Sequence, residues 1–272
     1  VLERKADDKR EKIKKNFSKL YDRLVLNLEK SFKKKIATIL LAQGKALKKA
    51  LLSLQEKKDE DVENNEEELE NQSNDITDKI FLLIAALLGT EYYNKLIMPI
   101  YEEAGKTGID FFNSLHYSNE DDYIKYEDVE ADYTGWLKDY SKQEIEYINN
   151  TTRNQVQRII KNGLSNGDNY DKIADDLFKH IENISSSRAR TVAMTEIHNV
   201  FSKSNFLSAT YKDMQSKTWC TQEDSKVRAS HVELDGMTIP IGEEFKPGLS
   251  YPGDSNADSS EVVNCRCFLQ YS

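Results

Sequence analysis

The sequence is poor in the residues that stabilise disulfide-rich and all-β proteins. Among its 272 residues are three Cys, four Pro and eleven Gly. Three Cys cannot build a disulfide framework, so we expect the protein to work in a reducing compartment. Few Pro and Gly provide few tight turns, which argues against a Greek-key β-protein. The sequence therefore favours a helix-rich fold held together without disulfides.

Long apolar segments are also missing. The longest run, 80–89, has ten residues, whereas a helix that spans a bilayer needs about 20. Residues 1–30 carry charges throughout and contain no apolar stretch typical of a signal peptide. With 31% charged and 38% hydrophobic residues, the composition predicts a soluble chain of one or two domains that has no membrane partner.

Several motifs typical of enzymes are absent. The sequence contains no Walker-type phosphate loop, no His-Glu-x-x-His motif and no zinc-deaminase pattern. Glu196 and His198 are two residues apart, so on a helix their side chains point about 200° apart and do not share a substrate. We therefore expect no catalytic residues, no cofactor and a noncatalytic protein.

Positive charge is concentrated at the start of the chain. The net charge is −9, yet residues 1–55 hold 16 Lys and Arg against 6 Asp and Glu, a local charge of 16 − 6 = +10. Apolar residues recur there every three or four positions, which predicts a basic helical arm that continues past Gly44 as a long helix or a helical hairpin. Such an arm fits contact with DNA phosphates, docking on an acidic protein surface, or a solvated helix face. The lysines assigned to DNA or partner contacts are Lys12, Lys14, Lys15, Lys19, Lys33, Lys34 and Lys35.

Residues 56–162 divide into an acidic segment and a longer segment with helical periodicity. Residues 56–74 are rich in Asp and Glu and poor in apolar residues, so we expect an acidic linker or a solvated helical bridge there. Helical periodicity returns over 75–162, with a kink or break expected at Pro99 and an extended connection over 117–135.

Residues 163–272 follow a different pattern. A helix is expected from near Arg188, capped by the three preceding serines. Strands are expected at 217–219 and 262–269, and Asp235-Gly236 is typical of a hairpin turn. The sequence thus predicts an α+β protein, mostly helical in its N-terminal part, with a small C-terminal α+β module over 163–272.

The expected helix after Arg188 carries small polar side chains on one face. They are Arg188, Thr191, Thr195, Asn199 and Ser202. Such groups indicate hydrogen bonds to something packed over the helix, because a solvated face usually carries Lys and Glu instead. We expect Arg188, Arg190 and Glu196 to tie this helix to the sheet through buried ion pairs, the alternative being that they grip DNA or a partner.

The module contains an ordered series of motifs. It begins with Gly163-Leu-Ser-Asn-Gly167 and Arg188-Ala-Arg190-Thr-Val-Ala-Met-Thr195-Glu196, followed by Asn199. It continues with Lys217-x-Trp219, Asp224-x-x-Val-Arg228-x-Ser-His231, Leu234-Asp235-Gly236, Glu244-Phe245, Tyr251-Pro-Gly-Asp254 and Asn264-Cys-Arg-Cys267. In its order and approximate spacing the series resembles the phage Mu F-like head morphogenesis family.

The resemblance implies structural rather than catalytic work. Members of this family are minor head proteins of tailed phages that associate with the portal vertex or are carried inside the procapsid. Some are thought to bind DNA and to leave the particle with it. The implied location is the virion interior or the portal vertex, with the host cytoplasm during assembly. The implied partners are the portal protein, packaged double-stranded DNA, and scaffold or capsid protein.

The alternative function is a phage-encoded effector or toxin enzyme that carries an F-like module. The resemblance implies it because such modules also occur joined to toxin domains, which follow the module. Five residues follow Cys267, so we expect no toxin domain after the module in this chain.

Three thiols and one imidazole have metal-ligand chemistry. Cys220, His231, Cys265 and Cys267 could complete a tetrahedral zinc shell. However, the Cys265-x-Cys267 spacing is tighter than is usual for zinc, and some members of the resembled family carry an additional Cys pair where this chain has none. We therefore prefer buried structural thiols beside a hydrogen-bonded His, with zinc and redox chemistry as the two alternatives.

Overall fold

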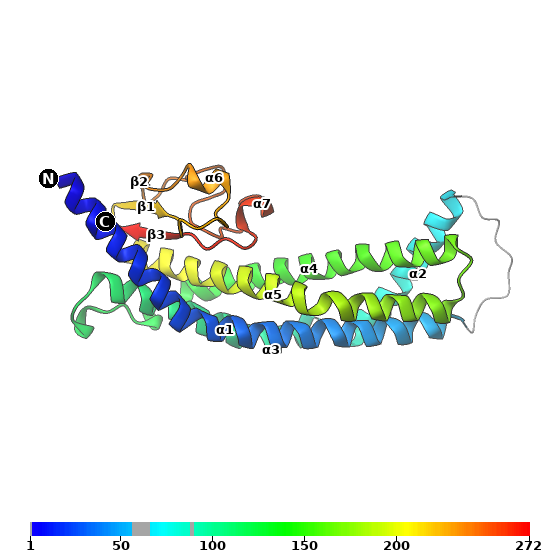
Figure 1. The fold of residues 1–272 in the computed structure, drawn as a ribbon. Helices are drawn as coiled ribbons and strands as arrows, with labels where there is room; N and C mark the ends of the chain where they lie inside the picture. Colours follow the sequence, from blue (N-terminus) through cyan, green and yellow to red (C-terminus); the bar gives the residue numbers. More distant parts are fainter. Residues whose placement is uncertain (1, 56–65, 88–89) are drawn as a thin grey trace. The chain divides into compact units, whose positions relative to one another are not determined.

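The computed structural model describes the backbone of residues 2–55, 66–87 and 90–272 and the side chains from Val25 onward, except those at 55–65, 68, 83–94 and 149 (Figure 1). Long helices dominate the described residues. They are α1 (Leu2–Gln55), α2 (Glu66–Leu87), α3 (Thr90–His116), α4 (Tyr126–Ser165) and α5 (Tyr170–Tyr211). The short helices are η1 (Glu120–Asp122), α6 (Ala229–Val232) and α7 (Ser259–Val262). The strands are β1 (Ser216–Cys220), β2 (Thr238–Pro240) and β3 (Phe268–Tyr271).

These elements confirm the predicted fold class, a mostly helical chain with a small C-terminal α+β module. The three strands form one antiparallel sheet in the order β2-β1-β3. None of the helices in the described part of the chain has an apolar stretch long enough to cross a bilayer.

The basic arm is one long helix rather than a hairpin. Helix α1 runs from Leu2 to Gln55 and passes through Gly44 without a break. A Cβ atom at Gly44 would lie 3.1 Å from Cγ2 of Ile181 on α5. Glycine is therefore accounted for here by the close approach of α1 and α5, and not by a turn.

Two predicted helix boundaries are wrong. The segment 117–135 was expected to be extended, but α4 begins at Tyr126. A helix start was expected near Arg188, but α5 runs unbroken from Tyr170 to Tyr211. The serines before Arg188 do not cap a helix, because the hydroxyls of Ser185 and Ser187 donate to carbonyls three residues earlier in the same helix, at 2.8 and 3.1 Å.

The acidic segment 56–74 is helical at its end, since α2 begins at Glu66. Residues 56–65 lie outside the described residues. Helix α3 continues through Pro99, where a kink or break was expected. The domain boundaries near 55, 74 and 162 stay a prediction.

The sheet differs from the predicted one in its hairpin and in its last strand. Strand β2 pairs with β1, Thr218 facing Thr238, so the hairpin within 234–241 is wrong. Asp235 and Gly236 instead form the turn that enters β2, where Gly236 adopts a φ of +82° and its N–H donates to the Trp219 carbonyl at 2.8 Å. The last strand was expected over 262–269 but begins at Phe268, because Ser259–Val262 form α7.

The chain divides into two compact units, each assembled from separate stretches of sequence. Unit 1 consists of the chain up to Phe32, Pro99–Tyr140 and Arg190–Ser272, and unit 2 of Lys33–Met98 and Ser141–Ala189. Strands β1 to β3 and both short helices α6 and α7 belong to unit 1.

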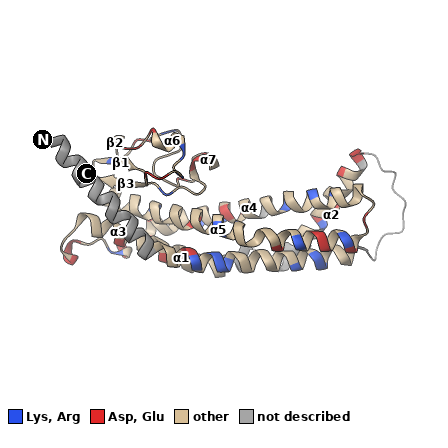
Figure 2. Cartoon of the chain, viewed as in Figure 1, with Lys and Arg blue, Asp and Glu red and all other residues tan. Residues whose placement is uncertain are grey.

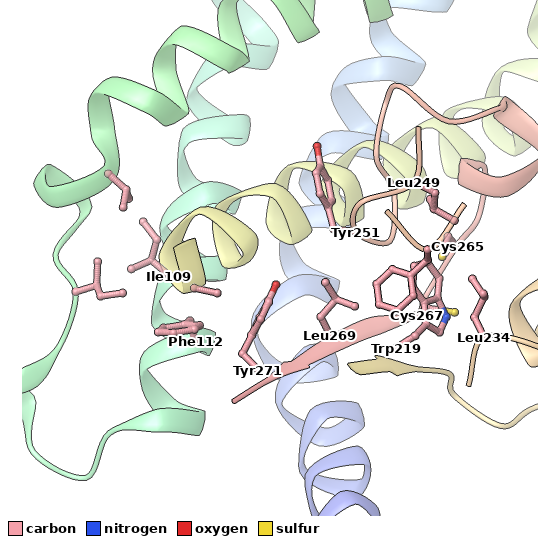
Figure 3. Close-up of a cluster of buried hydrophobic side chains, with 14 residues drawn as sticks. Ile109, Phe112, Trp219, Leu234, Leu249, Tyr251, Cys265, Cys267, Leu269 and Tyr271 are labelled. Atoms are coloured by element: carbon pink, nitrogen blue, oxygen red, sulfur yellow. The ribbon is translucent and has the colours of Figure 1, made fainter. Parts of the chain in front are cut away.

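The two units have different cores. The core of unit 1 contains Trp219, Tyr251, Tyr271 and two of the cysteines, together with aliphatic residues from α3 and the loops (Figure 3). The core of unit 2 is aliphatic, and its buried residues come from long helices. Its members are Leu47, Ala50, Leu51, Ile76, Ile80, Val156, Ile160, Ile173, Ala174, Leu177 and Ile181.

Candidate metal centre in the C-terminal module

Three buried side chains with metal-ligand atoms meet inside unit 1. His231 is on α6, and Cys265 and Cys267 lie in the loop between α7 and β3. The Cys267 Sγ is 3.4 Å and the Cys265 Sγ 3.7 Å from Nδ1 of His231. All three donor atoms lie within 4.8 Å of one another, and the residues are between 1% and 3% exposed. The structure thus brings together three of the four predicted ligands.

The orientation of the His231 ring is fixed from both sides. While Nδ1 faces the two sulfur atoms, Nε2 lies 2.9 Å from Oε2 of Glu261 on α7. Glu261 in turn accepts hydrogen bonds from Ser230 Oγ at 2.9 Å and from Lys246 Nζ at 3.3 Å. The Trp219 ring packs edge-on to the imidazole, with centroids 5.0 Å apart. Only one ring nitrogen of His231 is therefore directed at the thiols.

The two thiols have opposite pKa shifts. A hydrogen bond from Cys267, with further hydrogen bonds to His198 and His231, holds the pKa of Cys265 well below its usual range. The hydrogen bond to Cys265, together with burial, raises the pKa of Cys267. Two interacting thiols of this kind lose their protons in two coupled steps.

Cys220 does not join the other three predicted ligands, and His198, which was not predicted as a ligand, lies near Cys265. Cys220 is buried on β1, with its Sγ 3.8 Å from the Thr218 carbonyl, and does not belong to the group of three donors. His198, on α5, is buried and hydrogen-bonds to Cys265. His198 was not identified from the sequence as a possible ligand, because this residue was considered only as a catalytic pair with Glu196 and that pair was rejected. The sequence did contain one indication: His198 follows Thr195 by three residues, so on a helix it lies next to the polar face to which Thr195 belongs.

The polar face of α5 does hydrogen-bond to the segment packed over it, as predicted. The Asn264 N–H, next to Cys265, donates to Thr195 Oγ1 at 3.0 Å. A Cβ atom at Gly253, whose φ is +81°, would collide with the Asn199 side chain, so glycine is required where this loop meets α5.

The charged residues of this helix have other partners than the predicted ion pairs to the sheet. Glu196 is buried and accepts hydrogen bonds at 2.7 Å from the hydroxyls of Tyr101 on α3 and Tyr140 on α4. In unit 2, Arg188 donates to the Ile148 carbonyl at 2.8 Å and to a Thr hydroxyl on α4 at 2.9 Å. Arg190 is exposed. These contacts join helices to one another.

The remaining motif residues build the loops around the donors. Arg228 donates to the carbonyls of Ser260 and Val263, which fixes the end of α7. Asp224 forms an ion pair with Arg266 at 2.5 Å, and this contact lowers the pKa of the Asp224 carboxyl. Asp235 accepts the Thr221 N–H at 2.7 Å. Their role is thus to position the cysteine loop.

The basic arm is described in part. The side chains of Lys12, Lys14, Lys15 and Lys19 lie outside the described residues. Lys34 is exposed and Lys33 partly exposed, whereas Lys35 donates to the Leu96 carbonyl at 3.2 Å. Figure 2 shows Lys and Arg positions in blue along the described part of α1.

Gly163-Leu-Ser165-Asn-Gly167 has the letter pattern Gly-x-Ser-x-Gly but not the strand–turn–helix geometry of a nucleophile elbow. Ser165 ends α4, and its hydroxyl donates to the Lys161 carbonyl at 2.9 Å. The segment is a helix terminus, with Gly167 at a φ of +70°.

Comparison with known proteins adds three relatives. YqbB, an uncharacterized protein of Bacillus subtilis, is 33% identical over 142 residues, which are 49% of this chain and 46% of that protein. Minor head protein GP7 of Bacillus phage SPP1 is 32% identical over 136 residues, 48% of this chain and 42% of that protein. The NAD(+)--arginine ADP-ribosyltransferase EFV of Enterococcus faecalis is also 32% identical over 136 residues, but these are 28% of its length.

The chain therefore spans less than half the length of these curated relatives. No solved structure matches it. The model of the family described as Phage Mu protein F like protein matches residues 154–270, which contain the Arg188–Glu196 motif, the sheet and the Cys265-Arg-Cys267 loop. Over residues 154–270 the chain is thus similar to the phage Mu F-like proteins.

Proposed function

We propose that the protein is a noncatalytic minor head protein of a tailed phage, which associates with the portal and takes part in head morphogenesis. The observation that carries the proposal is the family match of residues 154–270, joined by the 32% identity to the minor head protein of SPP1. The protein then resides in the virion interior or at the portal vertex, and in the host cytoplasm during assembly. Scaffold or capsid protein is a further partner.

The contacts of the motif residues support a structural role. Glu196, Thr195, Arg228 and Asp235 all use their polar atoms to hold helices and loops in place. The group of two Cys and one His is buried, beneath a loop that Arg228 ties down. Such an arrangement gives a rigid module suited to docking on other head proteins.

Particle composition tests this proposal. Purified particles of the phage that encodes the protein should contain it, and cross-linking followed by mass spectrometry should join residues of the 163–272 module to the portal protein. Particles that assemble normally without the protein, or cross-links confined to proteins outside the head, would contradict it.

The basic arm leads us to propose contact with packaged DNA and departure from the head with it. The +10 charge of residues 1–55 supports this, as do the exposed Lys30, Lys34 and Lys45 on α1. Lysines that neutralise phosphates release counterions and require no base sequence, which suits a protein that meets any part of a genome.

Salt-dependent binding separates DNA contact from protein docking. We expect binding to two DNA duplexes of unrelated sequence with equal affinity, falling steeply as salt rises. Replacing Lys12, Lys14, Lys15 and Lys19 with Gln should flatten the salt slope by about 0.9 for each phosphate that the variant no longer neutralises. The matched control replaces four exposed lysines outside the arm, Lys125, Lys138, Lys142 and Lys226. An unchanged slope in the arm variant would assign the arm to docking on an acidic head protein.

The identity to EFV favours a second candidate, an effector enzyme of phage origin. The aligned residues cover 28% of EFV, so its activity does not pass to this chain by the match alone. Incubation of the full chain with NAD⁺ and an arginine-containing acceptor is the discriminating assay. Sustained release of nicotinamide that depends on the acceptor would replace the structural proposal with the enzymatic one.

A further inference from the structure

The donor atoms around His231 already have the spacing of a metal shell. With Zn–S of about 2.3 Å and Zn–N of about 2.0–2.1 Å, a tetrahedral site places sulfur and nitrogen about 3.6 Å apart. The two sulfur-to-Nδ1 distances are 3.4 and 3.7 Å. Ordinary packing of thiols against an imidazole does not require both distances to fall around this value.

The His231 ring is also oriented as in metal sites. Its Nδ1 faces the sulfur atoms, and its Nε2 lies 2.9 Å from the Glu261 carboxylate. A metal-binding histidine commonly directs its second nitrogen at a carboxylate, which fixes the tautomer and makes the first nitrogen a better ligand. Glu261 is held for this task by Ser230 and Lys246.

A candidate for the fourth ligand lies on α5, outside the group of three residues whose donor atoms all lie within 4.8 Å of one another. His198 is buried, hydrogen-bonds to Cys265, and has its Nε2 3.5 Å from Ser202 Oγ. Its Nδ1 is therefore the nitrogen that we assign to the cluster. His198, His231, Cys265 and Cys267 together provide two nitrogen and two sulfur donors, a set that selects zinc among the abundant divalent ions.

We propose that His198, His231, Cys265 and Cys267 bind one zinc ion, which joins α5, α6 and the loop before β3. With two thiolates and two neutral imidazoles the charge of the zinc ion is balanced, so the site suits a buried position. A shell with four protein ligands leaves no open coordination position, and such sites are structural. This proposal does not depend on the role in the phage head.

A small hollow lies next to three of the proposed ligands. It is lined by the ligand residues His231, Cys265 and Cys267 and by polar side chains. The polar residues are Gln222, Lys226, Arg228, Asn264 and Arg266.

Metal analysis of the full chain, purified without chelators from zinc-supplemented cells, is the first test. We expect about one zinc per chain, and Co²⁺ substitution should produce the thiolate-to-cobalt charge-transfer band and the visible bands of tetrahedral cobalt. In the unmodified protein, a mercurial that blocks two thiols should release one zinc to a colorimetric indicator, a result that needs no variant to fold.

Variants define the ligand set. Cys267→Ser should lose the stoichiometric zinc, and His198→Asn should weaken zinc affinity by more than about 100-fold, beyond the 10–100-fold typical of losing an outer partner such as Glu261. Cys220→Ser is the matched control, because Cys220 is equally buried in the same module but has its Sγ 3.8 Å from the Thr218 carbonyl on its own strand. It should keep its zinc and its cobalt spectrum.

Three results would overturn the proposal. One is a folded full chain that contains no zinc and gives no cobalt–thiolate band, which would establish a buried thiol core instead. Another is loss of zinc in Cys220→Ser. The third is unchanged zinc affinity in His198→Asn, which would remove His198 from the ligand set.

Discussion

The cores of units 1 and 2 use different means to hold similar lengths of helix. In unit 2, aliphatic side chains such as Leu51 and Ile160 repeat along helices, and ion pairs such as Lys48–Asp175 lie on the surface. In unit 1, Trp219 and Tyr251 pack among loops, and buried polar groups such as Glu196 have specific partners. A helical core of this kind tolerates exchange of one aliphatic residue for another, whereas the loop-built core depends on individual side chains.

The largest difference between the units should appear on removing Trp219. Trp219→Ala should cost about 3–5 kcal/mol, because the indole is fully buried between β3, α6 and Phe245. All three cysteines lie in unit 1, so their reaction with a thiol reagent reports on that unit alone. We expect faster thiol labelling with most of the far-ultraviolet helical signal retained. Equal loss of both signals would show that the units unfold together.

A buried carboxylate provides the next comparison. Glu196→Gln should destabilise the protein by about 1.5–3 kcal/mol, because one oxygen of Glu196 accepts both tyrosine hydroxyls and an amide group cannot accept them with the same strength. Glu182→Gln, at an exposed position of the same helix, is the control and should change stability by less than about 0.5 kcal/mol. Chemical denaturation measures both. Equal changes in stability for the two variants would mean that the buried Glu196 contributes no more than an exposed glutamate.

Lys217 on β1 gives unit 1 a dependence of stability on pH in the alkaline range. Burial lowers the pKa of Lys217 from 10.5 to about 8, although Asp254, Glu244 and Glu243 oppose the shift. The Nζ donates to the Ser250 carbonyl at 2.8 Å and lies over two Phe rings. Between these two pKa values the unfolded chain binds the proton more tightly, so the stability contributed at this site rises with pH.

The difference in unfolding free energy between the unmodified protein and Lys217→Met isolates this effect from other titrating groups. It should shift in favour of the unmodified protein by about 1–2 kcal/mol between pH 7 and 9.5. The exposed Lys226→Met serves as control. A difference that stays constant, or moves the other way, would mean that the folded protein keeps Lys217 protonated throughout.

The smallest effect is expected at the surface of unit 2. Lys48 and Asp175 form an ion pair at 2.5 Å, with side chains 39% and 54% exposed. A double-mutant cycle with Lys48→Met and Asp175→Asn should give a coupling energy of about 0.2–1 kcal/mol that decreases with added salt. A larger or salt-independent coupling would indicate that surface charges hold unit 2 more firmly than its core composition suggests.

Helical elements were predictable where apolar periodicity is regular, as along α1. The predicted helix boundaries were wrong at residues that are compatible both with a helix end and with a helix interior. Serine is a favourable residue at a helix N-terminus, yet the hydroxyls of Ser185 and Ser187 donate hydrogen bonds to carbonyls of the preceding turn inside α5. Glycine commonly interrupts helices, yet Gly44 lies within α1 and allows α1 and α5 to approach closely. Local preference gives way to tertiary packing at these positions.

The sequence predicted the kinds of residue in the candidate site, but not which cysteines and histidines lie together there. The Cys265-x-Cys267 motif and His231 were identified from chemistry alone, because thiols and imidazoles are rare in this sequence. The proximity of His198 to Cys265 could not be predicted, because it depends on a contact between residues 67 positions apart along the chain (265 − 198 = 67). Short sequence patterns do not contain such information.

Unit 1 combines three stretches that lie far apart in the sequence, so it can fold only after the last of them has been synthesised. Phe32 packs against Tyr101, while Trp219 needs Leu269 as its partner on β3. The core of unit 1 can therefore close only after the ribosome has added Leu269, whereas the last residue of unit 2 is Ala189. A ribosome that stalls within the module would thus release a chain with folded helices and no finished module.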